Sequence, residues 1–320
     1  MLIVGICLVF FYQQQMWILL VQSLFKKMIE EMKMDDKLLK KIFNMPDWPK
    51  IDFSLSEVSL EAQELTGKLS ISGVQPKLSV KLDRKKNMLV SVARGGEYIL
   101  KPQTLAYANI PENEQCCMDI AEAVGISVPE HCILPLKDNS LAYIVKRYDR
   151  NKGQKYNQED FQQALEKDDK YVGSVEEICR KLNAVSAVPG LDVQLLYEIV
   201  VLNFLLGNGD AHFKNYSLIT YDDVERRLAP AYDIVCSKLV IPKGKDSALT
   251  INGKQNNLER KDFDILAEYC KIPEKVRYVK FENKFNLMKK MIESSFIDEE
   301  KQGRFIGIVK ERFSRLKLSE

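Results

Sequence analysis

The sequence predicts an α+β protein with two lobes, in which a small antiparallel sheet precedes a mostly helical part. Short segments in which apolar and polar residues alternate lie between residues 78 and 147, with one helical segment among them. From residue 149 onward the apolar residues recur at helical spacing instead. With 320 residues, of which 46% are hydrophobic, the chain is long enough for each lobe to have its own core.

Residues 1–34 are expected to form an apolar N-terminal extension of unclear status. Residues 1–25 are strongly apolar, but three glutamines at 13–15 leave two runs that are each shorter than the ~20 residues of a membrane span. No basic segment precedes them and no small-x-small cleavage site is evident, so a secretory signal peptide is not indicated. Three interpretations stay open: an inner-membrane tether with Lys26 and Lys27 on the cytoplasmic side, a helix packed on the body, or a start upstream of the natural one.

The expected first lobe comprises residues 35–148. A helix at 34–43 ends before Pro46 and Pro49, and a second helix is expected at 56–65. An antiparallel meander follows, into which a helix at 111–124 is inserted. Its expected strands are 78–82, 88–92, 98–100, 131–135 and 141–147.

The expected second lobe comprises residues 149–320. Ser174 and Glu177 fit a capping box for a helix that ends near residue 186. Asp192 is expected to cap the next helix, 193–206, which is apolar on nearly all sides and should therefore be the central buried helix. The remaining expected elements are a hairpin formed by 216–220 and 227–229, and helices at 261–270, 273–292 and 298–316.

Charge and cysteine usage restrict the function classes. The 47 Lys and Arg residues nearly balance 45 Asp and Glu residues, which argues against a general nucleic-acid binder. The seven cysteines are odd in number and scattered and include no C-x-x-C, so neither a disulfide framework nor a zinc site is indicated. The only two histidines, His131 and His212, exclude a histidine-rich metal cluster.

The segment 207–215, Gly-Asn-Gly-Asp-Ala-His-Phe-Lys-Asn, gathers ionisable and amide side chains between the apolar helix and a strand. Asp210 and Asn215 stand five residues apart, as in the kinase pattern D-x-x-x-x-N, where the Asp orients the acceptor hydroxyl and the Asn binds magnesium. Asp233 follows after one hairpin, as the expected second oxygen ligand for magnesium. Lys101, at the end of a strand, would reach the nucleotide phosphates. The four residues together predict a phosphotransferase with a kinase-like fold, whereas the loop alone equally fits a solvated turn.

Two further groups belong to the same prediction. His212 and Lys214, within the loop, either support it or neutralise the transferring charge. Glu114, early in the inserted helix, either pairs with Lys101 or is a solvated residue of a first helical turn, and the sequence leaves both open.

A phosphate-covering loop is expected at residues 70–77, Ser-Ile-Ser-Gly-Val-Gln-Pro-Lys, just before the first strand of the meander. Backbone amides around Gly73 would bind phosphate, and Ser70 and Ser72 offer hydroxyls. The segment lacks the kinase pattern G-x-G-x-x-G, so by itself it is interpreted as an ordinary turn.

Five motifs in this order closely resemble the HipA family of toxin kinases, and the match runs from about residue 35 to the C-terminal region. The motifs are Ser-Gly-Val-Gln-Pro-Lys-Leu-Ser (72–79), Tyr-Ile-Leu-Lys-Pro (98–102), Lys-Arg-Tyr-Asp-Arg (146–150), Gly-Asn-Gly-Asp-Ala-His-Phe-Lys-Asn (207–215) and Ala-Pro-Ala-Tyr-Asp-Ile (229–234).

The resemblance implies a bilobal, protein-kinase-like fold and a serine/threonine kinase that uses ATP and Mg²⁺. It implies that Asp210 is the catalytic base and that Asn215 and Asp233 bind magnesium. Lys101 would contact the ATP phosphates, the hinge backbone at 146–149 would bind adenine, and Asp149 would bind the ribose. The remaining candidate nucleotide-binding residues are Ser72, Gly73, Val74, Glu114, Lys146 and Tyr148.

The resemblance also implies self-regulation and partners. Family members silence themselves by autophosphorylating the loop before the Val-Gln motif, where this chain has Ser70 and Ser72, and the Ser-x-Ser pair resembles the shorter HipT subgroup. Full-length HipA proteins carry an extra N-terminal subdomain, and it is expected to be missing here, since about 70 residues precede the loop. In HipT-like systems a small HipS-like protein supplies it, alongside a DNA-binding HipB-like antitoxin.

The known family targets, glutamyl- and tryptophanyl-tRNA synthetase, imply a protein substrate. The chain itself is expected in the cytoplasm, and no direct contact with nucleic acid is expected. The residues do not select between the two targets. The alternatives are a small-molecule or lipid kinase of the same fold, and an inactive scaffold that binds nucleotide or an antitoxin without phosphoryl transfer.

Overall fold

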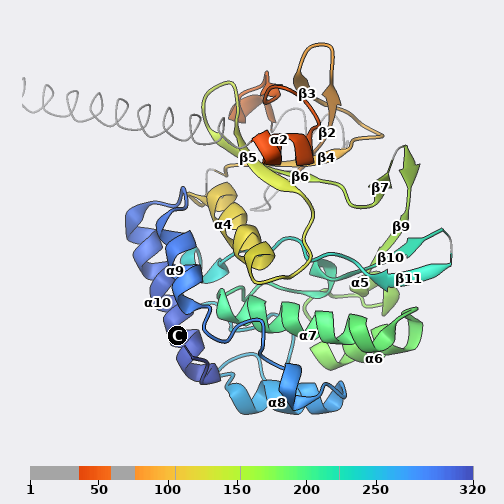
Figure 1. The fold of residues 1–320 in the computed structure, drawn as a ribbon, viewed down its shortest axis with the longest axis vertical. Coiled ribbons are helices and arrows are strands. Elements are labelled where there is room, and N and C mark those ends of the chain that lie inside the picture. The colour runs from red at the N-terminus through yellow and green to blue at the C-terminus, as the bar shows by residue number, and fades with distance from the viewer. Residues whose placement is uncertain (1–35, 59–75, 105, 152, 223, 320) are drawn as a thin grey trace, which may run out of the picture.

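The computed structural model describes residues 36–58, 76–104, 106–151, 153–222 and 224–319, and these residues form two lobes (Figure 1). The N-lobe carries a sheet with the strand order β1-β3-β2-β4-β6-β5, and the C-lobe is mostly helical. The elements of the N-lobe are α2 (Asp36–Ile42), β1 (Lys50–Ile51), β2 (Leu78–Asp83), β3 (Met88–Ser91), β4 (Tyr98–Pro102), α4 (Ile110–Ala123), β5 (His131–Pro135) and β6 (Leu141–Lys146).

The N-lobe sheet follows the alternation that the sequence predicts. All of its pairings are antiparallel except that of β1 with β3. Along β2, Leu78, Val80 and Leu82 are buried and lie in one apolar cluster with residues of α2, because successive side chains of a strand point to opposite faces. β4 lies between β2 and β6, so Lys101 at its end is paired with Tyr143 and is enclosed by neighbouring strands.

The helix α4 connects the two lobes. It contacts β5 and β6 of the sheet and α9 of the C-lobe, and Figure 1 shows it between them. Its residues Cys117 and Ile120 belong to the apolar core of the C-lobe, which also includes Tyr143 and Val145 from β6. The inserted helix predicted at 111–124 is therefore correct in position, and it packs on both lobes.

The C-lobe elements surround the buried helix α7 (Pro189–Leu205). A three-stranded sheet with the order β11-β10-β9 lies beside it, and β10 and β11 form the predicted hairpin. The other described elements are β7 (Arg150–Asn151), β8 (Gln154–Lys155), β9 (Asn157–Asp160), α5 (Phe161–Ala164), α6 (Val175–Val185), β10 (Ser217–Tyr221), β11 (Glu225–Leu228), α8 (Arg260–Tyr269), α9 (Phe285–Glu293) and α10 (Glu299–Leu316), with short 3₁₀ turns at Phe213–Asn215, Ser237–Leu239 and Glu274–Val276.

Two helix boundaries differ from the sequence-based expectation. The predicted helix 193–206 begins earlier, because Pro189 occupies a permitted first-turn position, so Asp192 lies inside the helix and does not cap it. The predicted helix 273–292 is divided into a 3₁₀ turn and α9, and Asn283 between them has a left-handed backbone with φ 59°. The capping box of α6 at Ser174 and Glu177 is confirmed. Of the helix expected at 56–65, residues 56–58 are helical and the rest lies outside the described residues.

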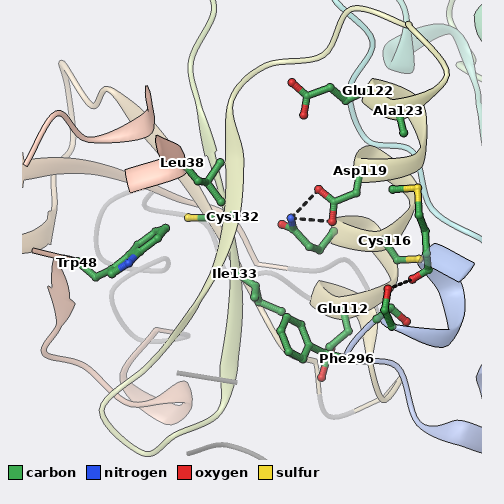
Figure 2. A pocket seen from close by; sticks show the side chains of 14 residues that line it. Leu38, Trp48, Glu112, Cys116, Asp119, Glu122, Ala123, Cys132, Ile133 and Phe296 are labelled. Carbon is green, nitrogen blue, oxygen red and sulfur yellow. Dashed lines mark hydrogen bonds between the residues drawn. The ribbon is translucent and has the colours of Figure 1, made fainter. Parts of the chain in front are cut away.

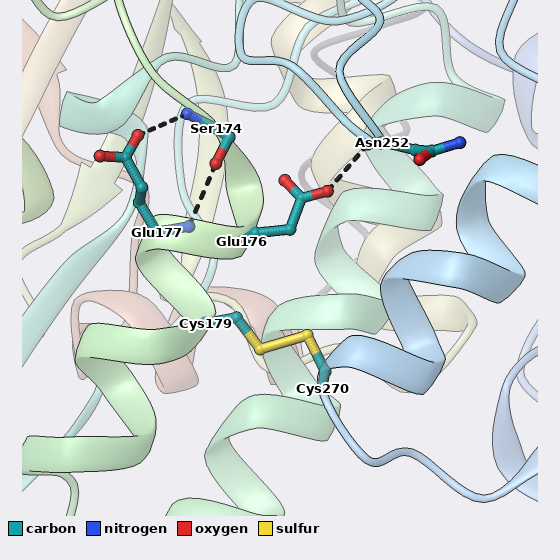
Figure 3. Close-up of a disulfide and its surroundings, with 6 residues drawn as sticks. All are labelled: Ser174, Glu176, Glu177, Cys179, Asn252 and Cys270. Carbon is teal, nitrogen blue, oxygen red and sulfur yellow. Dashed lines mark hydrogen bonds between the residues drawn. A yellow bond between two sulfur atoms is a disulfide. The ribbon is translucent and has the colours of Figure 1, made fainter.

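The cysteines correct a second expectation. Cys179 in α6 and Cys270, the residue after α8, form a disulfide, although the scattered cysteines gave no sign of one (Figure 3). The two residues are 91 positions apart, and the packing of the helices brings their Cα atoms to 6.3 Å. Cys116, Cys117, Cys132 and Cys236 are free and buried.

None of the helices in the described part of the chain is both long enough and apolar enough to cross a membrane.

Asp192 is expected to stabilise the C-lobe strongly. Its carboxylate is fully buried, and it accepts hydrogen bonds from Arg227 Nη2 at 2.9 Å, the Leu228 amide at 2.9 Å and Ser186 Oγ at 2.6 Å. Asp192→Ala leaves these donors unpaired and should lower the free energy of unfolding by about 3 kcal/mol. Urea-induced unfolding of wild type and variant measures this difference. The same change at exposed Asp47 should cost less than about 0.5 kcal/mol, and equal losses for both variants would contradict the prediction.

Candidate active site

A cavity of 580 Å³ lies between the two lobes. Its walls come from β4, α4, β6, the segment 146–149 that connects the lobes, the loop 207–215 and the segment around Asp233. It is lined by every described residue that the sequence singled out as a site residue, namely Lys101, Glu114, Lys146, Tyr148, Asp149, Asp210, His212, Lys214, Asn215 and Asp233. The predicted residues Ser70, Ser72, Gly73 and Val74 lie outside the described residues.

A second cavity, of 510 Å³, lies on another side of α4 (Figure 2). Trp48, Cys116, Asp119 and Phe296 contribute to its lining, and none of the predicted site residues does. The chemistry predicted from the sequence therefore belongs to the first cavity.

Lys101 is the centre of the candidate site. Its side chain is about 5% exposed, and Nζ lies 2.5 Å from Glu114 Oε1 and 2.6 Å from Asp233 Oδ1. Of the two readings that the sequence left open for Glu114, the structure shows the paired one. Asn113, next to Glu114, donates to the Cys236 carbonyl at 3.1 Å and accepts from the Cys236 amide at 2.8 Å. These bonds attach α4 directly to the segment that carries Asp233.

The protonation states of this trio follow from burial and mutual attraction. Burial alone would lower the pKa of Lys101, but the charges of Asp233 and Glu114 outweigh it and raise that pKa. Burial raises the pKa of Glu114 despite the nearby ammonium. For Asp233, attraction to Lys101 and Lys77 outweighs burial and holds the pKa well below its usual range. At neutral pH the site thus holds an ammonium against an ionised Asp233.

The loop 207–215 has a rigid internal scaffold. Gly207 has φ 70° and lets the chain turn at the end of α7. Asn208 donates to Asn203 Oδ1 at 2.8 Å and accepts from the Asp210 amide at 3.2 Å. A Cβ atom at Gly209 would lie 2.1 Å from the Lys245 carbonyl oxygen, so only glycine fits there. The loop is therefore held from within and by the neighbouring segment.

Asn215 and Asp233 are in direct contact in the cavity wall. Asn215 Nδ2 donates to Asp233 Oδ2 at 3.0 Å, and Asn215 Oδ1 accepts from the His212 amide at 3.0 Å. Asp233 has φ 60°, a conformation that is unfavourable for a residue with a side chain and that recurs at functional sites. Within the described ranges no three His, Cys, Asp or Glu side chains are grouped as a metal site. One amide and one carboxylate oxygen nevertheless suit Mg²⁺, which usually takes its other ligands from phosphates and water.

Asp210 and His212 both line the cavity from the loop 207–215, and the first is exposed whereas the second is buried. Asp210 is exposed, and its Oδ1 accepts a hydrogen bond from the hydroxyl of Tyr171 at 3.0 Å. Burial and the charge of Lys170 lower the pKa of His212, so the imidazole is neutral near pH 7. A neutral imidazole favours a supporting role in the loop over neutralisation of transferring charge. The side chain of Lys214 is exposed at the cavity.

In the segment that connects the lobes, groups that were predicted to bind the nucleotide already form hydrogen bonds within the protein. The backbone amide of Lys146 donates to the Glu130 carbonyl at 2.8 Å. Asp149 is only 3% exposed, and Arg147 donates to both of its carboxylate oxygens at 2.8 and 2.7 Å. The ring of Tyr148 lies 6.0 Å from that of Tyr232. A ribose at Asp149 would therefore share the carboxylate with Arg147.

Sequence reasoning missed several residues that line the cavity. Lys77 lies 3.6 Å from Asp233 Oδ2, and its place at the end of the predicted phosphate loop was a usable signal. Arg147 lies within the predicted hinge 146–149, but its side chain was not predicted to bind Asp149. Lys170 and Tyr171 are about 40 positions before Asp210 and lie in no motif, so only the tertiary structure brings them to the site.

Comparison with protein families and curated proteins gives a consistent result. The model of the HipA-like C-terminal domain matches residues 69–297. A putative kinase of Haemophilus influenzae is 32% identical over 202 residues, which cover 58% of this chain and 58% of that protein. A putative kinase of Sinorhizobium fredii is 34% identical over 206 residues, covering 59% of this chain and 50% of that protein. The chain thus aligns with about half the length of these relatives.

Two solved structures share the fold. HipA of Shewanella oneidensis, solved in complex with HipB and its operator DNA, has a TM-score of 0.64 and 20% identity, covering 78% of this chain and 65% of that one. The proinflammatory kinase CtkA of Helicobacter pylori has a TM-score of 0.52 and 17% identity, covering 69% of this chain and 85% of that one. The predicted α+β, kinase-like fold is confirmed.

The pairing of Lys101 with two carboxylates makes a testable contribution to stability. Lys101→Met leaves Glu114 buried without a cation and should cost about 3 kcal/mol at pH 7. The loss should shrink as the pH falls from 7 to 5, because the native variant then binds a proton at Glu114 more readily than the unfolded chain does.

Urea unfolding of both proteins at pH 5, 6 and 7 measures this difference. Lys81→Met is the matched control, because Lys81 is an exposed strand residue. A loss that does not depend on pH would show that the buried carboxylate is not its cause.

Proposed function

Because the chain belongs to the family of the HipA-like C-terminal domain, we propose that it is a serine/threonine protein kinase that uses ATP and Mg²⁺. The observation that carries the proposal is the position of the Lys101 ammonium, 2.5 Å from Glu114 and 2.6 Å from Asp233. A buried lysine held by a helix glutamate, beside an Asn and two Asp residues on one cavity wall, is the set that phosphoryl transfer requires.

Each residue has one role in the proposed reaction. Lys101 binds the nucleotide phosphates, and Glu114 holds the lysine in place from α4. Asn215 and Asp233 hold Mg²⁺, which neutralises charge on the phosphates when it is bound. Asp210 accepts the hydrogen bond of the acceptor hydroxyl and takes its proton during transfer. The exposure of Asp210 supports this role, because an acceptor from another protein can reach it.

The nucleotide would enter between the lobes. Its adenine would lie against the segment 146–148 and its ribose near Asp149. The phosphates would lie under the loop that contains Ser72, Gly73 and Val74. The contact of Lys77 with Asp233 supports this placement, because Lys77 is the last residue of that loop and lies on the phosphate side of the cavity.

The cellular role proposed for the chain is that of a toxin in a toxin–antitoxin pair of the HipBA or HipBST type. A structural neighbour is a HipA protein solved with HipB and operator DNA, which supports a HipB-like antitoxin as partner. A small HipS-like protein is proposed as a second partner. The proposed substrate is a cytoplasmic aminoacyl-tRNA synthetase, either the glutamyl or the tryptophanyl enzyme.

Separate variants of the two Asp residues distinguish chemistry from binding. Asp210→Asn should retain ATP affinity but slow the transfer of label from ATP by about 10²- to 10³-fold, because the base is lost. Asp233→Asn should weaken Mg²⁺-dependent ATP binding, because a metal oxygen ligand is lost.

Labelled ATP with Mg²⁺, incubated with the chain and with a bacterial extract, measures transfer, and calorimetry measures binding. Asp168→Asn, an exposed residue without a side-chain partner in the described part, is the matched control. If wild type and Asp210→Asn transfer label equally, or neither transfers any while ATP still binds, the kinase proposal fails and the scaffold alternative stands.

Autophosphorylation at Ser70 or Ser72 is a second expected outcome. Intact-mass spectrometry of the chain expressed in bacteria should show added phosphate, and peptide mapping should place it on one of these serines. The Asp210→Asn variant and the double Ser70→Ala, Ser72→Ala variant should both lack it. Phosphate that persists in Asp210→Asn purified from a host without related kinases would contradict self-modification.

A further inference from the structure

One of the two carboxylate oxygens of Asp210 accepts a hydrogen bond from the hydroxyl of a tyrosine, Tyr171. Tyr171 donates to Asp210 Oδ1 at 3.0 Å from a loop 39 positions earlier in the chain. Within the described residues, Asp210 Oδ2 has no hydrogen-bond partner. The carboxylate therefore has one oxygen that is bound by the protein and one that has no partner among the described residues, and the residue lines the cavity.

The ring of Tyr171 has contacts with two neighbouring side chains although the residue is 42% exposed. Its plane stands at 80° to the ring of His212, with the centroids 5.0 Å apart. The ammonium of Lys170 lies 4.8 Å from the ring centroid, within the range of a cation–π contact. The backbone amide of Tyr171 donates to Asp169 Oδ1 at 2.8 Å. These contacts accompany the orientation in which the hydroxyl reaches Asp210.

The loop that carries Tyr171 is bound to the catalytic loop itself. The Phe213 amide donates to the Lys170 carbonyl at 3.1 Å, and the Thr250 amide donates to the Gly173 carbonyl at 3.0 Å. Gly173 has φ 155°, and a Cβ atom there would lie 2.5 Å from the ring of Phe213. Glycine thus permits the close approach of the two loops. Tyr171 and Asp210 consequently keep their relative position as one unit.

The hydroxyl of Tyr171 is a donor throughout the physiological pH range. Burial and the negative charge of Asp210 raise the pKa of Tyr171 to about 12. The phenol is therefore neutral at pH 7, and its proton is available to the carboxylate. Hydrogen bonds from a neutral hydroxyl to an ionised carboxylate are among the stronger ones in proteins.

We propose that Tyr171 is a positioning residue for phosphoryl transfer, which holds Asp210 through Oδ1 so that Oδ2 faces the acceptor hydroxyl. The inference rests on the proposed function, because it requires Asp210 to receive the acceptor proton. Without Tyr171 the exposed carboxylate can rotate about its side-chain bonds, and fewer molecules have Oδ2 in the productive direction.

The test compares Tyr171→Phe with wild type in the full chain. At saturating ATP and Mg²⁺, the rate of label transfer to the chain itself and to proteins of a bacterial extract should fall about tenfold, the loss expected for one hydrogen bond to a charged group. ATP affinity should stay unchanged, because Tyr171 contacts none of the described residues that are proposed to bind nucleotide. Tyr269→Phe, which removes the hydroxyl of a tyrosine that is 47% exposed in α8, should have no effect.

A double-mutant cycle with Asp210→Ala separates positioning from a merely structural role. If Tyr171 acts through Asp210, adding Tyr171→Phe to Asp210→Ala should slow transfer no further. An equal slowing in both backgrounds, or an unchanged rate in Tyr171→Phe, would overturn the inference. A faster rate would also overturn it, since the hydroxyl would then compete with the acceptor. Asp210→Ala with the wild-type rate would instead overturn the proposed function.

Discussion

The positive charge of Lys101 is the constraint on which the candidate site depends. Its ammonium is almost fully buried, so it needs carboxylates on either side, and these are Glu114 and Asp233. The three residues come from β4, from α4 and from the C-lobe segment after β11. One small ion-pair network thus couples the sheet, the connecting helix and the C-lobe. In the proposed nucleotide complex the phosphates would compete with Asp233 for the ammonium, while Glu114 would continue to hold it.

The helix α4 makes this arrangement stable, because it belongs to both lobes. Cys117 and Ile120 are buried in the C-lobe core, and Asn113 forms two hydrogen bonds with the backbone of Cys236. A movement of α4 would therefore separate Glu114 from Lys101 and also disturb the segment that carries Asp233. The relative position of the two lobes and the geometry around Lys101 and Asp233 are therefore linked through this helix.

The cavity has a buried side, which contains Lys101, and an exposed side, which contains Asp210. On the buried side, Lys101, Asn215 and Asp233 are fixed by direct bonds to one another and to the backbone. On the exposed side, the proposed reaction would require Asp210 to be reachable by another molecule, and its side chain is exposed. The hydroxyl of Tyr171, from the neighbouring loop, donates a hydrogen bond to its Oδ1. This division suits a reaction in which the nucleotide is enclosed and the acceptor comes from outside.

The sequence by itself determined most of the order of strands and helices and four central residues of the cavity, Lys101, Asp210, Asn215 and Asp233, because alternation and the D-x-x-x-x-N spacing are local properties. Asp192 shows the limit: its residue type fits a helix cap, but Pro189 starts the helix earlier and Arg227 binds the carboxylate inside the protein. Only the tertiary structure decided that Glu114 pairs with Lys101, that Cys179 meets Cys270, and that Tyr171 reaches Asp210. Each of these depends on how packed elements bring distant residues together, and no spacing along the chain records that.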